Sequence, residues 1–136
     1  MKRFFLMLVM AVLFVGCSST SPILVQKSKP LYEEEKVLVM GINDYDFTQK
    51  LSEQLILDGW RVLYGEDPVE NKIFAIRFRL DESSRTMTGK SRYSGTIIAF
   101  DLREGRPASG VKVYDRKGDS IVGDFLTDFY NKIEVK

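Results

Sequence analysis

Apolar residues in the N-terminal half of the chain repeat in patterns that predict a strand, a helix and a second strand. The stretch KVLVMGIND, residues 36–44, is a nearly continuous apolar run, which is typical of a strand buried on both faces. A helical spacing of apolar residues follows, where Asp46 and Gln49 match a capping box and Gly59 suits the C-cap. Residues 60–64, WRVLY, predict the next strand, and the tight connections favour a right-handed crossover onto a parallel neighbour.

Strict alternation and one long apolar stripe mark the C-terminal half of the chain. In KIFAIRFRL, residues 72–80, the apolar side chains face one way and the two arginines the other, which predicts a strand with one wet face. Residues 91–103 and 111–115 predict two further strands, joined through polar turns. A closing helix is expected to begin at Asp119 or Ser120. Its predicted core stripe contains Ile121, Phe125, Leu126, Phe129, Tyr130 and Ile133.

Together these elements predict an α+β fold in the order β-α-β-β-β-β-α. We expect a mixed, mostly antiparallel sheet of four or five strands with two helices packed on one face, an α/β sandwich. The domain is expected to span 36–136. Residues 17–35, SSTSPILVQKSKPLYEEE after the cysteine, mix Ser, Pro and charge and predict a flexible linker. The apolar patch at 23–25 leaves an edge strand or a partner contact open as alternatives.

The first 16 residues have the composition of an export signal. Lys2 and Arg3 precede an apolar run from 4 to 15, which is too short to span a bilayer comfortably. A basic start followed by such a run is typical of a secretory signal peptide.

The sequence Phe14-Val15-Gly16-Cys17 resembles the lipobox of bacterial lipoproteins. The resemblance implies cleavage between Gly16 and Cys17, a diacylglycerol thioether on the Cys17 thiol, and an N-acyl chain such as palmitate on the new N-terminus. Stable residence on a membrane takes two or more acyl chains. In such families a residue other than aspartate after the cysteine, here Ser18, implies sorting to the outer membrane, so we expect a lipid-anchored domain that faces the periplasm.

Composition argues against several classes of function. The 136 residues carry a net charge of +1, whereas a nucleic-acid binder needs a clustered basic surface. One cysteine and no histidine leave no cysteine-cluster metal site and no Ser-His or Cys-His nucleophile. The acidic pairs all have structural explanations at helix starts or strand ends: Asp44 with Asp46, Asp81 with Glu82, and Asp101 with Glu104. The chain is therefore expected to be non-enzymatic, with no cofactor or metal beyond its covalent lipid.

The most unusual candidate site is basic. Arg77 and Arg79 lie on the wet face of one predicted strand, and Arg85, Lys90 and Arg92 flank the loop that follows it, so the five are expected to lie close together. One interpretation is that these charges keep an open sheet soluble and discourage edge pairing. The other is a contact surface for an acidic partner, lipid headgroups or cell-wall carboxylates.

The order of elements over 36–133 also resembles the small α/β domains of curli-secretion lipoproteins and of lipoprotein activators of penicillin-binding proteins. The lipopolysaccharide-assembly lipoprotein is a further small α/β example. This resemblance implies an accessory, assembly or interaction factor for another component of the cell envelope. The alternative is a carrier or sensor of a lipid-like or lipopolysaccharide-like amphiphile, which needs a concave apolar pocket. No sequence pattern selects an oligomeric state.

Overall fold

The computed structural model describes residues 18–65, 73–85, 87 and 89–136. The predicted signal peptide and Cys17 lie outside these residues. The described residues form two α-helices, α2 (Thr48–Leu57) and α3 (Gly118–Lys132), and a short 3-10 turn η1 (Glu33–Glu35). The strands are β1 (Ser19–Pro22), β2 (Val37–Met40), β3 (Arg61–Tyr64), β4 (Phe74–Arg85), β5 (Ser91–Asp101) and β6 (Arg106–Lys117).

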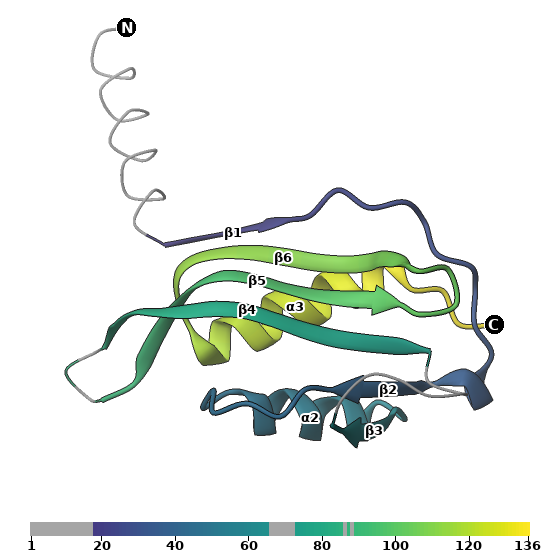
Figure 1. Ribbon diagram of the computed structural model, residues 1–136, viewed down its shortest axis with the longest axis horizontal. Helices are drawn as coiled ribbons and strands as arrows, with labels where there is room; N and C mark the ends of the chain where they lie inside the picture. Colours follow the sequence, from purple (N-terminus) through teal and green to yellow (C-terminus); the bar gives the residue numbers. More distant parts are fainter. Residues whose placement is uncertain (1–17, 66–72, 86, 88) are drawn as a thin grey trace, which may run out of the picture.

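All six strands form one sheet in the order β1-β6-β5-β4-β2-β3. The pairs β1–β6, β6–β5 and β5–β4 are antiparallel, whereas β2 is parallel to both β4 and β3. The three long strands run side by side with α3 behind them, and α2 lies beside β2 and β3 (Figure 1). The predicted α+β class and mixed, mostly antiparallel sheet are confirmed, and the additional strand is β1.

Strand β4 confirms the predicted alternation. Phe74, Ile76 and Leu80 are buried in the hydrophobic core, and Phe78 packs against that core. Arg77 and Arg79, which alternate with them, are exposed on the face opposite the helices. The period of two along a strand therefore separates the core from an open face of the sheet.

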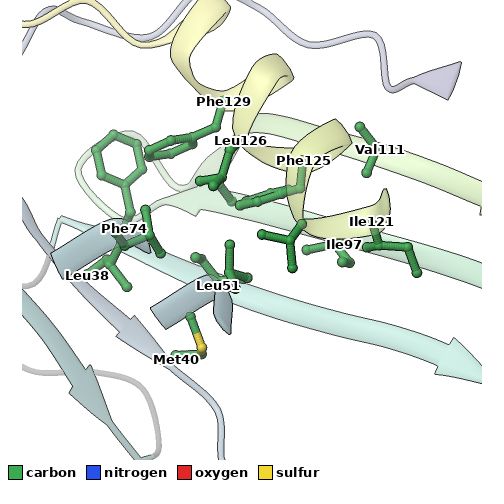
Figure 2. Packing of buried hydrophobic residues seen from close by; sticks show 14 of the residues in the cluster. Leu38, Met40, Leu51, Phe74, Ile97, Val111, Ile121, Phe125, Leu126 and Phe129 are labelled. Atoms are coloured by element: carbon green, nitrogen blue, oxygen red, sulfur yellow. The ribbon is translucent and has the colours of Figure 1, made fainter. Parts of the chain in front are cut away.

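The core fills the space between the sheet and the two helices. Phe125, Leu126 and Phe129 point from α3 toward the strands, and Leu51 reaches the same region from α2 (Figure 2). The Phe129 ring lies 5.8 Å from Phe74, edge to face, an arrangement that aromatic pairs favour. Tyr130 departs from the expected stripe: its side chain is 42% exposed, and its hydroxyl donates a hydrogen bond to the Asp58 carboxylate.

The predicted capping box of the first helix is wrong. The N-cap residue of α2 is Phe47, and it makes no side-chain capping bond. Instead the Asn43 side-chain oxygen accepts hydrogen bonds from the Tyr45 amide (3.0 Å) and the Thr48 hydroxyl (2.6 Å), which orders the turn before the helix. The Asp46 carboxylate accepts from the Tyr93 hydroxyl at 3.0 Å, so tertiary contact competes with local capping for this carboxylate.

Residues 19–35 correct the expectation of a flexible linker. Strand β1 pairs antiparallel with β6 over four residues, and the Ile23 amide extends this contact by donating to the Gly110 carbonyl. Leu31 is fully buried, and its amide and carbonyl bond Glu134 and Lys136. A side chain buried in this way adds to the core, so the segment belongs to the domain.

Both hairpins are longer than their apolar patterns predicted. Strand β4 continues to Arg85 through a polar stretch, and β6 begins at Arg106, inside a segment expected to form a turn. In the part of the chain that the structure describes, no helix is long and apolar enough to cross a membrane.

Candidate functional site

A groove lies where β2 stops and β4 continues. Strand β2 pairs with β4 over only three residues of each strand, ending at Ile76, and the chain then turns away at Gly41. On its other side β4 pairs with β5 as far as Arg85. Beyond Ile76, therefore, no strand among the described residues covers the second edge of β4.

The groove at this edge has a volume of about 700 Å³. One wall comes from the ends of β2 and β3, and the other from β4. Its lining consists of Gly41, Ile42, Asn43, Tyr45, Gly65, Ile76, Arg77, Phe78 and Arg79. The lining combines main chain, apolar side chains and two cations, which suits an extended polar ligand.

Tyr45 closes the far end of the groove. Its hydroxyl donates a 2.8 Å hydrogen bond to the Leu80 carbonyl of β4. The ring stacks on Phe47 at 5.6 Å and contacts Tyr93 edge to face at 5.5 Å. Because hydrogen bonding and ring packing both fix this side chain, the groove wall is preorganised.

Arg77 and Arg79 stand on the open face beside the groove. The Arg77 guanidinium lies over the Phe100 ring, 4.5 Å from its centroid, a cation–π contact that limits the freedom of the side chain. Arg79 is exposed, and it forms no ion pair with any other described residue. Two cations two residues apart on one strand point to the same side.

The other three predicted cations are engaged elsewhere. Arg85 pairs with Glu82 at 3.1 Å, within the distal hairpin. Arg92 donates to the Asp115 carbonyl at 2.9 Å and lies 3.5 Å from its carboxylate. Lys90 lies 3.9 Å from the Asp119 carboxylate at the start of α3, on the helix-covered side. The five residues therefore do not form one continuous basic surface, and only Arg77 and Arg79 line the groove.

Local hydrogen bonds perturb the pKa of one acid near the hairpin. The hydroxyls of Ser83 and Ser84 donate to the Asp115 carboxylate at 2.8 and 2.9 Å, and they lower the pKa of this group. Under the groove wall, burial and the bond to Asp46 raise the pKa of Tyr93. Both perturbed groups lie outside the groove lining.

At least one member of each acidic pair considered from sequence has a structural partner, and Asp101 is the most deeply buried of them. Asp101 is fully buried, where it accepts from the Ser28 hydroxyl at 2.9 Å and from the Arg103 guanidinium at 3.0 Å. Arg103 also donates to the Lys29 carbonyl at 2.8 Å. This network attaches the segment before β2 to the sheet. No group of three metal-binding side chains occurs within the described ranges.

Sequence reasoning found the two arginines but missed the opposite wall. Asn43 and Tyr45 belong to the segment NDYD, whose pattern predicts only a strand end and a helix start. The available signal was its position after a buried strand that is parallel to its neighbours. Ligand sites gather at the carboxyl ends of such strands.

Comparison with known proteins identifies a shared fold. A single-residue variant of the PelC dodecamer from Paraburkholderia phytofirmans is 12% identical, with a TM-score of 0.56 over 86% of this chain and 99% of that chain. A second crystal form of the PelC dodecamer has a TM-score of 0.51 at 12% identity, covering 88% of this chain and 99% of the other. No family model matches the chain. No curated protein sequence matches it either.

Proposed function

We propose that this protein is a lipid-anchored lipoprotein of the bacterial outer membrane that binds another envelope component in the groove beside β4. The observation that carries this proposal is the edge of β4 beyond Ile76, flanked by Arg77 and Arg79, which no other strand of the described residues covers. The lipobox sequence and Ser18 support the anchor and its location. Attachment to a membrane surface raises the effective concentration of the domain near other membrane-bound components.

The lining of the groove favours binding over catalysis. None of its nine residues is a carboxylate, a histidine or a cysteine, and the Tyr45 hydroxyl already donates to Leu80. An enzyme needs a nucleophile or base held against a substrate atom. A carrier of acyl chains would need an apolar enclosure, whereas this groove is open and bordered by guanidinium groups.

Self-association is part of the same proposal. The sheet ends in two four-residue edge strands, β1 and β3, on opposite sides of the domain. Different edges at opposite ends permit head-to-tail contacts between copies, which close into rings when the rotation allows it. The dodecameric state of the PelC structures with this fold supports the idea. Light scattering of the detergent-purified chain should give a multiple of the protomer mass, and a monomer at all concentrations would contradict it.

Site-specific photocrosslinking in cells tests the binding proposal. Ile42 lines the groove and is 83% exposed, whereas Leu57 on α2 is 80% exposed and does not line it. A photoreactive residue in place of Ile42 should capture an envelope component, and the same residue at Leu57 should not. Capture at neither position, or equal capture at both, would contradict a partner in the groove.

The anchor is tested separately. Metabolic labelling with a palmitate analogue should mark the wild-type protein in the outer-membrane fraction, and Cys17→Ala should remove the label. Labelling that persists in Cys17→Ala would place the lipid elsewhere or refute lipidation at this residue.

A further inference from the structure

Inside the groove, the main chain of β4 presents an edge that no strand of the described residues pairs with. Peptide groups along a strand point alternately to its two sides. The Leu80 carbonyl faces the groove, because it accepts the Tyr45 hydroxyl there. The N–H and C=O of Phe78, two residues earlier, therefore face the same side, at a position beyond the last β2 pairing at Ile76.

The groove has the position of a missing strand. Strand β2 runs beside β4 to Met40 and Ile76, and the groove begins where Gly41 leaves that line. An extended segment entering here would continue the row of β2 and pair with the peptide groups of Phe78. Exposed edges of this kind are templates for strand addition, in which main-chain bonds supply affinity and side chains supply specificity.

The flanking charges specify the chemistry of the incoming segment. Arg77 and Arg79 occupy successive positions on the open face, and the ring of Phe100 holds the Arg77 guanidinium in place. Residues directly across a strand pair interact most favourably when their charges are opposite. Asp81 is the next residue of β4 on this face, and its carboxylate would repel an acidic side chain placed opposite it. The positions that favour acidic side chains in the incoming segment therefore end at Arg79.

We infer that the β4 edge receives an extended peptide with carboxylates at alternating positions, added as a strand with its acidic side chains over Arg77 and Arg79. This inference rests on the proposed function, and it assigns the partner class and the binding mode. An acidic polysaccharide or a lipid headgroup also carries charge complementary to the arginines, but neither has amides that pair with the Phe78 peptide groups in strand register.

Fluorescence anisotropy with defined probes tests the inference on the full chain in detergent. The probe is a labelled Asp-Val-Asp-Val-Asp-Val peptide, compared with a Lys-Val peptide of equal length and with oligogalacturonate. Two further peptides carry N-methyl groups on alternate amides, either on one edge or on the other. The double variant Arg77→Ala/Arg79→Ala should lower the affinity for the Asp-Val peptide at least tenfold. Arg85→Ala removes a cation outside the groove and should change this affinity less than twofold.

Strand addition also requires an effect of the peptide main chain. Only one of the two N-methylated peptides should lose binding, and hydrogen exchange at the Phe78 amide should slow when the unmodified peptide is bound. Equal binding of both N-methylated peptides, oligogalacturonate binding as tight as the peptide, or no saturable binding up to about 1 mM peptide would overturn the inference. If any of these outcomes occurred while the photoreactive residue at Ile42 still captured a component in cells, only the peptide inference would fail. The proposed function would stand, because the captured component would be a partner of another class.

Discussion

Replacing Leu31 by Ala tests whether the segment before β2 belongs to the folded domain. The Leu31 side chain is fully buried, so truncation leaves a cavity in the core. Leu→Ala changes at such positions cost about 2 to 5 kcal/mol of unfolding free energy. The main-chain bonds of Leu31 to Glu134 and Lys136 remain in the variant, so the loss reports the side chain alone.

Urea unfolding followed by Trp60 fluorescence measures the effect. Trp60 is 3% exposed and packs between Phe74 and Phe129, so its emission should change when the core opens. A loss of 3 kcal/mol at a slope of about 1.5 kcal/mol/M lowers the midpoint by about 2 M. For an exposed leucine in the same segment, Leu24→Ala is the matched control and should change stability by less than about 0.5 kcal/mol. Equal midpoints for Leu31→Ala and Leu24→Ala would refute docking of this segment.

Three further predictions concern backbone conformation and pH. At Gly95, φ is +142° and an added Cβ would lie 1.9 Å from a carbonyl oxygen of β4, so Gly95→Ala should cost about 2 to 4 kcal/mol in urea unfolding. Gly123 lies within α3 with nothing within 4 Å of an added Cβ, so Gly123→Ala should instead stabilise by about 0.5 to 1 kcal/mol; the same sign for both variants would contradict the geometry. Removing the hydroxyls of Ser83 and Ser84 should raise the pKa of Asp115 toward 3.8, as followed by carboxyl NMR titration, and an unchanged value would refute their role. Because folding lowers this pKa, the stabilisation from Asp115 is present above the pKa of the unfolded carboxyl and is lost as pH falls through the folded value.

Elements whose burial is encoded locally could be predicted from sequence. The alternation in β4 and the apolar stripe of α3 each repeat with the period of their element, and both place their apolar side chains on the core side, except that Tyr130 of the expected stripe is exposed. The two arginines of the groove followed from the same period. The period of apolar residues does not predict which distant parts of the chain an element will contact.

Features that depend on such neighbours escaped prediction. Strand β1 has the sequence STSP, without apolar alternation, and it forms because β6 offers a free edge and Asp124 accepts the Thr20 hydroxyl at 2.6 Å. Asp46 matches a local cap, yet Tyr93 in a later strand takes its carboxylate. The expected basic surface divides for the same reason, because Asp115 and Asp119 engage Arg92 and Lys90 only after folding.

The position of β1 limits how far an anchored domain can stand from the bilayer. Only Ser18 separates Cys17 from Ser19, the first residue paired with β6, and two residues of extended chain reach about 7 Å. If the chain is lipidated, the folded domain would lie directly against the lipid headgroups, with the β1 edge of the sheet facing them. Anchoring at so short a standoff restricts rotation as well as height, and it selects which surfaces of the domain neighbouring molecules can reach.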